Sequence, residues 1–213
     1  MRYYIADCHF FHEALNREMD HRGFASVEEM NEYMIKRWNE KVRNRDEVLI
    51  LGDLSMGNAE QTNDLLDRLQ GKLFLIVGNH DNRYLRSKTF HKERFGWIYP
   101  YAELHDDGRK VVLSHYPIAC YNGQYLKNKK GEPRTYMLYG HVHDSHDERL
   151  IEQYQQMVEK TRIPDRDGGT QSLSSHMINC FCMYSDYQPL SLDEWIALTK
   201  QRLIRCQNVE DSL

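Results

Sequence analysis

The sequence has no apolar run that approaches the roughly 20 residues needed for a helix to cross a bilayer. Its first residues, Met-Arg-Tyr-Tyr-Ile-Ala-Asp, lack the long apolar stretch of a secretory signal. Internal repeats and low-complexity segments are also missing. We therefore expect a cytoplasmic protein with no membrane partner.

Cysteine is scarce, and its positions form no framework. The five cysteines are odd in number and irregularly spaced, which argues against a disulfide scaffold; they are Cys8, Cys120, Cys180, Cys182 and Cys206. The alternation at Cys180-Phe181-Cys182 is typical of a buried strand. A net charge of −4 gives no general attraction to nucleic acid or to anionic membranes. Any binding of nucleic acid would therefore have to be local, either at bound metals or on a basic loop.

Apolar, β-prone runs alternate with helical patterns along the 213 residues. Several runs are continuous, as expected of strands that are covered on both faces. The predicted strands are residues 3–6, 48–51, 73–77, 111–113, 136–139 and 177–184. The predicted helices are residues 27–42, 60–69 and 148–161 and a last helix from Ser191, and the first and last open with the capping boxes Ser26 to Glu29 and Ser191 to Glu194. This alternation predicts one layered α/β domain over residues 1–213, with loops at 122–133 and 163–175.

Polar residues suited to metal binding follow five of these predicted strands. They are Asp7 with His9, Asp53, Asn79, His115, and His141 with His143. Open α/β sheets place chemistry beyond the carboxyl ends of their strands, and residues i and i+2 of an extended chain point to the same side. If the pair Asp7 and His9 or the pair His141 and His143 is considered alone, chance is the better explanation of its spacing. Five segments in one ordered series at strand ends instead indicate a shared site.

The residue types in this series favour two divalent metal ions. Imidazole and oxygen ligands without thiolate suit Mn²⁺, Fe, Zn²⁺, Co²⁺ or Ni²⁺, and ligand identity does not choose among them. The +4 charge of two ions exceeds the negative charge of Asp7, Asp53 and a bridging hydroxide, so the site would attract a phosphate ester. Two metals roughly 3.5–4 Å apart can activate that hydroxide and hold the phosphate oxygens for in-line attack.

The order of these motifs resembles that of the calcineurin-like metallophosphoesterases. The series is Asp-x-His, Gly-Asp, Gly-Asn-His-Asp, a lone His and Gly-His-x-His, and it runs from Asp7 to His143. Residues 7–12, Asp-Cys-His-Phe-Phe-His, and 114–117, Ser-His-Tyr-Pro, resemble the small bacterial and phage-type members. The resemblance implies a four-layer αββα sandwich with two facing mixed β-sheets, with the final strand and helix of the family expected over residues 177–203.

The same resemblance implies a role for each residue of the series. Asp7, His9 and His143 would hold one metal. Asn79, His115 and His141 would hold the other. Asp53 would bridge both, which its two carboxylate oxygens allow. His80 would act as the general acid that protonates the leaving alkoxide while metal-bound hydroxide attacks a phosphomonoester or phosphodiester.

Several further residues have two interpretations. His12, Tyr116 and Asn122 are candidates for substrate contacts, and packing or surface roles compete for them. Asp81 would either orient His80 or cap a turn, and we favour the turn. A basic cluster is either a clamp on a phosphate or nucleotide or a solvated loop, and we favour the loop; the cluster comprises Lys127, Lys129, Lys130 and Arg134. Residues 144–175 form a predicted insertion that would serve as a lid, a dimer contact or decoration.

Two other functional classes compete with a general phosphoesterase. The first is a nuclease or cyclic-nucleotide phosphodiesterase, which would need a groove for the rest of its substrate. The second is a catalytically silent scaffold, but every expected ligand and His80 are present. The chain also lacks the Arg-Gly that follows Gly-Asp in serine/threonine protein phosphatases, since Leu54-Ser55 stands there. A phosphate-clamping arginine is therefore missing there, which argues against protein phosphatase activity.

Overall fold

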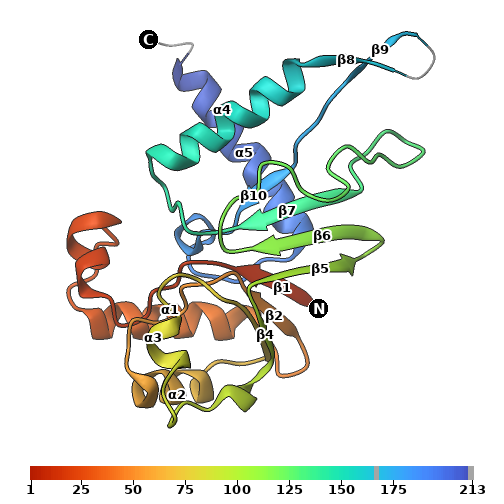
Figure 1. Ribbon diagram of the computed structural model, residues 1–213. Helices are drawn as coiled ribbons and strands as arrows, with labels where there is room; N and C mark the ends of the chain where they lie inside the picture. Colours follow the sequence, from red (N-terminus) through yellow and green to blue (C-terminus); the bar gives the residue numbers. More distant parts are fainter. Residues whose placement is uncertain (166–167, 211–213) are drawn as a thin grey trace.

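Two four-stranded β-sheets face each other at the centre of the molecule (Figure 1). The computed structural model describes residues 1–165 and 168–210, with side-chain packing up to residue 204. The first sheet has the order β1-β2-β3-β4, formed by β1 (Arg2–Ile5), β2 (Glu47–Ile50), β3 (Lys72–Ile76) and β4 (Phe95–Tyr99). The second has the order β10-β7-β6-β5, formed by β5 (Tyr101–Asp106), β6 (Arg109–Ser114), β7 (Thr135–Tyr139) and β10 (Met177–Asn179).

Within these two sheets, neighbouring strands are parallel except where β5 pairs antiparallel with β6. An isolated antiparallel bridge between Tyr4 and Leu190 also extends the first sheet beyond β1. Parallel strands bring their carboxyl ends to one edge of a sheet, so the residues after β1, β2 and β3 share one edge, as do those after β6 and β7.

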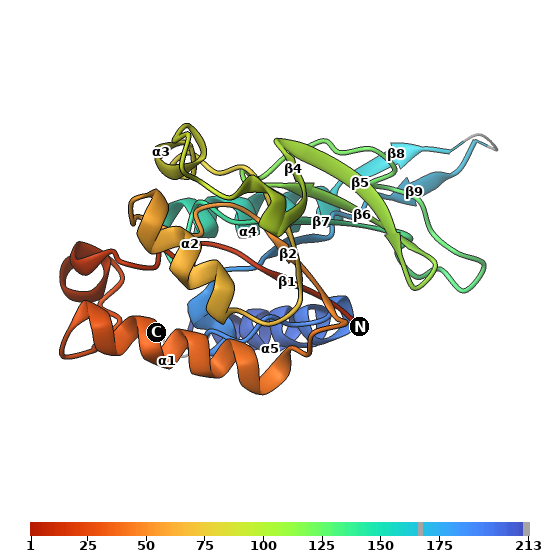
Figure 2. The ribbon, with the colours of Figure 1, turned by 90° about the horizontal axis from the view of Figure 1, so that it is seen from below.

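Apolar side chains fill the space between the sheets, with Leu49 on β2 facing Leu138 on β7 in one buried cluster. The outer face of the first sheet packs against α1 (Val27–Lys41) and α2 (Ala59–Arg68), through Met34, Trp38 and Leu65 among others. The outer face of the second sheet packs against α4 (His146–Lys160) (Figure 2). The predicted α/β class and the αββα order of layers are therefore confirmed.

The helix starts follow local hydrogen-bonding signals. Ser26 Oγ accepts a hydrogen bond from Glu29 N at 3.2 Å, as the predicted cap requires. Ser191 Oγ likewise accepts from Glu194 N, at 3.4 Å, at the start of α5 (Leu192–Glu210). The start of α2 has a full capping box between Asn58 and Gln61, which we did not anticipate. Such caps are worth about 1 kcal/mol each and fix where a helix begins.

The prediction of one strand over residues 177–184 is wrong beyond Asn179. Cys180 N still donates to Tyr139 O of β7, but Cys182 N donates to Ala6 O, next to β1. The chain therefore crosses from the second sheet to the first and then forms a 3₁₀ turn at Cys182–Ser185. Burial on both faces made these residues look like a strand, because the crossing itself is buried.

The loop prediction for residues 163–175 is also wrong, since a hairpin of β8 (Arg162–Pro164) and β9 (Thr170–Ser172) lies there. Strands β4 and β5 were missed because both are edge strands, where polar and exposed residues are tolerated. Residues 122–133 do form turns, with one bridge between Lys127 and Pro133. The short helical segments Leu15–Met19, α3 (Asn82–Leu85) and Lys92–Arg94 were not anticipated.

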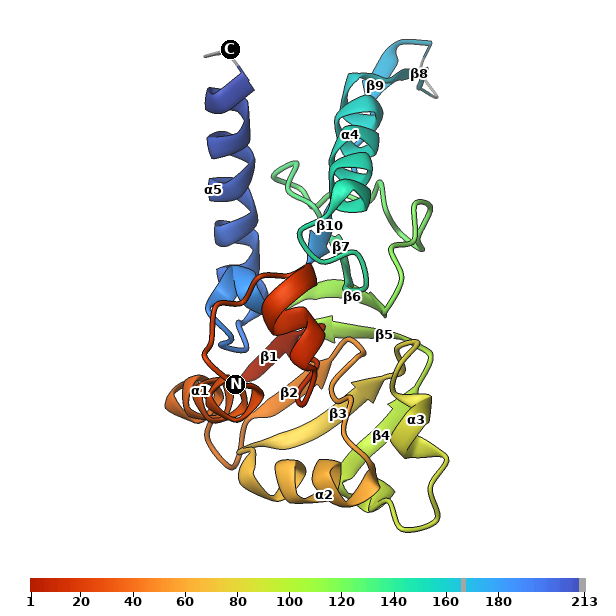
Figure 3. The same ribbon diagram turned by 90° about the vertical axis from the view of Figure 1, so that its left-hand side faces the viewer.

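Helices α4 and α5 extend away from the sheets, and the β8–β9 hairpin lies beyond the end of α4 (Figure 3). The predicted insertion at 144–175 thus comprises α4 and this hairpin, with residues 166–167 outside the described part. A cavity of about 390 Å³ lies between α4 and α5. Among the described residues, no helix has the length and apolar character required to span a bilayer. Cys8, Cys120, Cys180 and Cys182 are free thiols, and the Cys206 side chain lies outside the described part.

The first turn of α4 is joined to the second sheet by a buried carboxyl group. Glu148 Oε2 accepts hydrogen bonds from Tyr139 Oη at 2.8 Å and Asn179 Nδ2 at 3.0 Å. Burial raises the pKa of Glu148 from 4.5 to about 7, against the opposing effects of Tyr139, Arg202 and Asn179. A raised folded-state pKa stabilises the fold below pH 4.5, and that contribution is lost as the pH rises through about 7.

We therefore predict that Glu148→Gln removes a pH-dependent loss of stability. The wild-type free energy of unfolding should fall relative to that of the variant by up to about 3 kcal/mol between about pH 5 and about pH 8. Urea unfolding of both proteins across this range measures the difference. Glu159→Gln, at an exposed position of the same helix, is the control and should follow the wild type. Parallel pH profiles for Glu148→Gln and wild type would contradict the prediction.

Candidate metal centre

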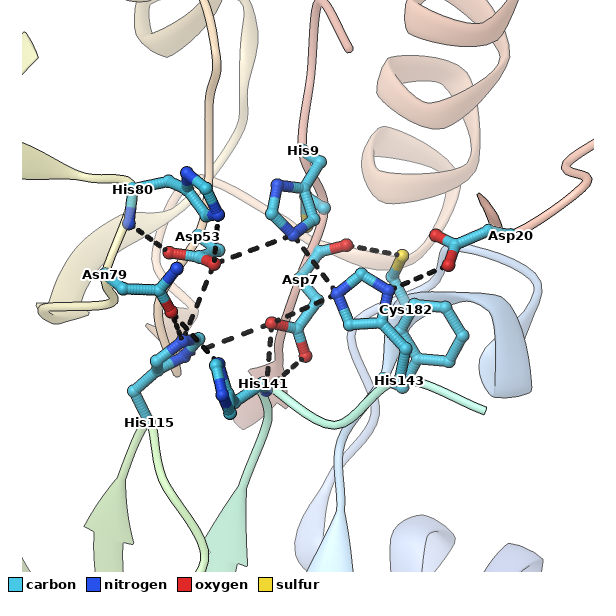
Figure 4. Close-up of polar contacts among 12 residues, drawn as sticks. Asp7, His9, Asp20, Asp53, Asn79, His80, His115, His141, His143 and Cys182 are labelled. Carbon is cyan, nitrogen blue, oxygen red and sulfur yellow. Dashed lines mark hydrogen bonds and ion pairs between the residues drawn. The ribbon is translucent and has the colours of Figure 1, made fainter. Parts of the chain in front are cut away.

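All seven predicted metal ligands lie together at the carboxyl-terminal edges of the two sheets (Figure 4). The first sheet contributes the residues after β1, β2 and β3, and the second contributes those after β6 and β7; they are Asp7, His9, Asp53, Asn79, His115, His141 and His143. Contacts between residues 134 positions apart, such as His9 with His143, join the two edges. The site therefore exists only because the sheets pack face to face.

One group consists of Asp7, His9 and His143, whose possible ligand atoms all lie within 4.8 Å of one another. The Nε2 atoms of His9 and His143 are 3.2 Å apart, and His143 Nε2 is 3.8 Å from Asp7 Oδ1. Asp7 and His9 are buried and His143 is partly buried. Two imidazole nitrogens and a carboxylate oxygen therefore face a common point.

A second group forms around the side-chain oxygen of Asn79. Asn79 Oδ1 lies 2.8 Å from His115 Nε2 and 3.0 Å from His141 Nδ1. The two groups are linked by Asp53, whose Oδ2 is 3.6 Å from His9 Nε2 and 3.5 Å from His115 Nε2. A carboxylate in this position can serve ligand sets on both sides.

The hydrogen bonds of His115 indicate which of its ring nitrogens carries the proton. His115 Nδ1 is 2.8 Å from Leu51 O, and because a carbonyl only accepts, the Nδ1–H must donate. When the ring is neutral, Nε2 is then left with a lone pair directed at the oxygen of Asn79. Two acceptors at this distance repel unless a cation lies between them. This arrangement fits a metal ion.

The ionisation of the site also fits a cation. Burial lowers the pKa values of His9, His115 and His141, which keeps their imidazoles in the neutral form that binds metals. Burial raises the pKa values of Asp7 and Asp53 although backbone N–H groups donate to both. Within the described chain, His9 Nδ1 is buried without a hydrogen-bond partner. Two buried carboxylates beside neutral imidazoles would be stabilised by positive charge.

Five of the seven candidate ligands have left-handed backbone conformations. Their φ angles are 55° at Asp7, 47° at His9, 52° at Asp53, 72° at His141 and 50° at His143. Positive φ is uncommon for residues with a Cβ atom, and each such residue costs on the order of 1–3 kcal/mol. The surrounding structure must supply that energy. The left-handed conformation ends the extended run of each strand and directs these side chains inward.

The glycine that precedes each of three ligand segments makes room for a ligand. A Cβ atom on Gly140 would lie 2.5 Å from Asp7 Oδ2, and one on Gly78 would lie 2.2 Å from Asp53 Oδ1. Gly52 has φ of 89°, and a Cβ there would lie 2.3 Å from His115 Nδ1. These glycines therefore allow backbone from one segment to approach the ligand of another.

Asp81 has a role that differs from both interpretations offered for it. Its buried carboxylate accepts hydrogen bonds from Asp53 N at 2.9 Å, Leu54 N at 3.0 Å and Gly78 N at 2.7 Å. Tyr84 Oη also donates to it, at 2.7 Å. Asp81 does not cap α3 through its side chain. It instead binds the segments after β2 and β3 to each other, through the backbone of Asp53, Leu54 and Gly78.

His80 lies at the open side of the ligand cluster (Figure 4). Its side chain is 44% exposed, its Nε2 is 4.0 Å from Asp53 Oδ2, and its backbone N–H donates to Asp53 Oδ1 at 2.9 Å. His80 lines a cavity of about 420 Å³ together with His9, Asp53 and Asn79. The ring is therefore accessible from the cavity and close to the centre of the cluster.

The three candidate substrate residues have different positions. His12 lines the cavity. The Tyr116 ring is half-exposed and 4.5 Å from the His141 ring, beside the cavity and not among its described lining residues. Asn122 lies outside the cavity, because its side chain donates to Glu103 on β5. The basic cluster ends immediately before β7, at the opposite end of that strand from His141, and none of its residues lines the cavity.

Two residues that contact the candidate ligands were not indicated by any sequence pattern. Asp20 Oδ1 is 2.8 Å from His143 Nδ1, and Arg22 donates to the backbone oxygens of Asp7 and Cys8. Both follow the short π-helical segment Leu15–Met19, away from any strand end. Reasoning from strand ends therefore could not find them.

The chain resembles known proteins over most of its length. Residues 3–195 match the family described as calcineurin-like phosphoesterase. The chain is 31% identical over 209 residues to the uncharacterized protein MJ1445 of Methanocaldococcus jannaschii, covering 97% of this chain and 96% of that protein. It is 27% identical over 167 residues to the gene 66 protein of Mycobacterium phage L5, covering 66% and 76% respectively. A solved protein of unknown function from Aquifex aeolicus, AQ665, has the same fold with a TM-score of 0.63 and 23% identity, covering 93% of this chain and 98% of that one.

We predict that Asp81→Asn destabilises the protein. The amide NH₂ of asparagine would face backbone N–H groups whose hydrogen bonds the carboxylate now accepts. Leaving buried donors unsatisfied costs about 1–3 kcal/mol each, so a loss of about 2–4 kcal/mol is expected. The free energy of unfolding in urea measures it. Tyr84→Phe removes a single donor to the same carboxylate and serves as the matched control, with an expected loss of about 1 kcal/mol. Equal stability of Asp81→Asn and wild type would show that the carboxylate does not hold these segments.

Proposed function

The chain belongs to the calcineurin-like phosphoesterase family, and we propose that it uses two divalent metal ions to hydrolyse a phosphomonoester or a phosphodiester. The observation that carries this proposal is the arrangement of nitrogen and oxygen ligands in two groups with Asp53 between them. When bound, the two ions would supply Lewis acidity and lower the pKa of a water molecule enough for it to attack phosphorus.

The chain's own residues divide this work among them. Asp7, His9 and His143 would hold one ion, which is supported by their mutual distances. Asn79, His115 and His141 would hold the other, which is supported by the two imidazole nitrogens that converge on Asn79 Oδ1. Asp53 would contribute one carboxylate to both. Its charge is the only one shared by the two groups in this proposal.

His80 would donate a proton to the oxygen of the departing alcohol. Its exposed ring, at the open side of the cluster, supports this role, because a general acid must reach the substrate from solvent-accessible space. Its backbone is fixed by the hydrogen bond from His80 N to Asp53 Oδ1. The ring is thus tied to the centre of the site without being one of its closest ligands.

His12 would orient the phosphate group from the wall of the cavity. Its Nδ1 accepts a hydrogen bond from Leu15 N at 3.3 Å, so the neutral ring carries its proton on Nε2. That Nε2–H is a donor of the kind that a phosphate oxygen accepts. Burial lowers the pKa of His12, which favours this neutral form.

The charge of the cavity bears on the class of ester. No lysine or arginine is among the described residues that line it, whereas Asp144 and Asp147 are. Positive charge to attract phosphate would therefore come from the bound ions, with the neutral His12 ring adding a hydrogen-bond donor, and additional phosphates would meet carboxylates. This favours a substrate with a single phosphate group, such as a small diester or a mononucleotide, over an oligonucleotide. The nuclease alternative has no support from these charges.

We predict that Asp53→Asn abolishes most activity because it removes the shared charge. Metal-stripped wild-type protein reloaded with Mn²⁺ should hydrolyse bis-p-nitrophenyl phosphate or p-nitrophenyl phosphate. The activation free energy of the variant should be higher by several kcal/mol, which lowers the rate about 100-fold or more. Elemental analysis should find fewer than two ions per chain. Asp107→Asn, the same change on an exposed turn, is the control. Full activity with two ions in Asp53→Asn would argue against a shared ligand.

We predict a different outcome for His80→Gln. The variant should keep its metal content and lose roughly 10²–10⁴-fold in turnover, with the greater loss on phenyl esters than on p-nitrophenyl esters, because a poor leaving group depends more on protonation. Rates on both esters, measured beside metal content, test this. His91→Gln, at an exposed position outside the site, should match wild type. Loss of metal from His80→Gln would instead identify His80 as a ligand.

A further inference from the structure

A buried ion pair lies directly behind one of the two ligand groups. Arg22 Nη2 is 2.9 Å from Asp20 Oδ2, and Arg22 Nε is 3.1 Å from the same oxygen. The Arg22 side chain is fully buried and that of Asp20 is 7% exposed. Charged groups are rarely buried in this way without a specific partner and a specific task.

Arg22 fixes the backbone at the first ligand segment. Its Nη1 donates to Cys8 O at 2.7 Å and its Nη2 donates to Asp7 O at 3.1 Å. These are consecutive carbonyl groups at the point where Asp7 and His9 adopt left-handed conformations. A planar guanidinium with several donors can hold both carbonyls and still pair with Asp20, which a lysine cannot do with the same geometry.

Asp20 fixes the ring of a ligand that comes from the other sheet. Its Oδ1 is 2.8 Å from His143 Nδ1, and because an ionised carboxylate only accepts, Nδ1 must carry the proton (Figure 4). When the His143 ring is neutral, its lone pair is then on Nε2, the atom that lies 3.2 Å from His9 Nε2. A carboxylate behind a histidine ligand sets both its tautomer and its ring orientation.

We propose that Asp20 and Arg22 are positioning residues for the ion held by Asp7, His9 and His143. Arg22 holds the backbone conformation of Asp7 and Cys8, and Asp20 holds His143 in its Nδ1–H tautomer. The ion pair between Asp20 and Arg22 links the backbone on one side to the His143 ring on the other. This inference rests on the proposed function. It assigns the segment after Leu15–Met19 to the construction of the site, a role that the ligand motifs do not contain.

The proposal predicts an asymmetric effect on metal binding. Asp20 and Arg22 contact residues of one ligand group and neither contacts Asn79, His115 or His141 through a described hydrogen bond. Replacing a carboxylate behind a histidine ligand commonly lowers metal affinity by about 10–100-fold. Asp20→Asn should therefore weaken one of two binding events by that factor and leave the other unchanged.

Calorimetric titration of metal-stripped protein with Mn²⁺, and separately with Zn²⁺, tests this prediction. Asp20→Asn is compared with wild type and with Asp107→Asn, the same substitution at a position that is 87% exposed. Nitrogen-15 NMR of the histidine rings gives a second readout that needs no catalysis. The His143 ring should be the Nδ1–H tautomer in wild type and a mixture in Asp20→Asn. Arg22→Lys, which keeps the charge but not the paired carbonyl contacts, should weaken the same binding event, and it provides the test if Asp20→Asn does not fold.

The possible failures can be told apart. Two binding events in wild type, with unchanged affinities and an unchanged His143 tautomer in Asp20→Asn, would overturn this inference and leave the proposed function intact. Equal weakening of both events would also overturn it, since the contacts reach one group alone. Wild-type protein that takes up neither metal would overturn the proposed function and this inference together.

Discussion

The backbone at the ligand residues is held in a conformation that it would not adopt alone, and buried hydrogen bonds to charged side chains hold it there. Asp81 accepts from three backbone N–H groups around Asp53 and Gly78. Asp7 accepts from His141 N at 3.0 and 2.9 Å, and Arg22 donates to the carbonyl of Asp7 itself. Each left-handed segment is therefore bound to a segment from another part of the chain. The ligands converge because these bonds offset the local strain.

The two sheets are connected at the same place. The segment after β10 bonds first to Tyr139 and then to Ala6, so it joins the second sheet to the first beside Asp7. Trp195 Nε1 donates to Tyr4 O at 2.9 Å, which fixes the start of α5 on β1. Ligands from both sheets can keep constant distances only if the sheets do not slide. The crossing after Asn179, which we had predicted as plain strand, supplies that connection.

Charge organises the site at two levels. Near the ligands, burial favours neutral imidazoles and disfavours the charges of Asp7 and Asp53. Divalent ions would bind the neutral imidazoles and would stabilise the two ionised carboxylates. At the cavity wall the charged residues are acidic, so the ions would be the source of attraction for a phosphate group. Under the proposed function, such a site would select its substrate by charge as well as by shape. One phosphate group would bind where the ions lie, and a chain of phosphates would be disfavoured.

The sequence by itself determined the series of candidate ligands, the α/β class and most helix starts, because strand periodicity, capping residues and strand-end motifs are local signals. It also singled out His80 as a candidate general acid, directly after a candidate ligand. Tertiary structure alone decided the contacts of Asp81, Asp20 and Arg22, the crossing after Asn179 and the edge strands β4 and β5. The physical reason is that a hydrogen bond between buried groups depends on distance in space, and residues such as Asp20 and His143 are 123 positions apart in the chain. No local pattern records such a contact.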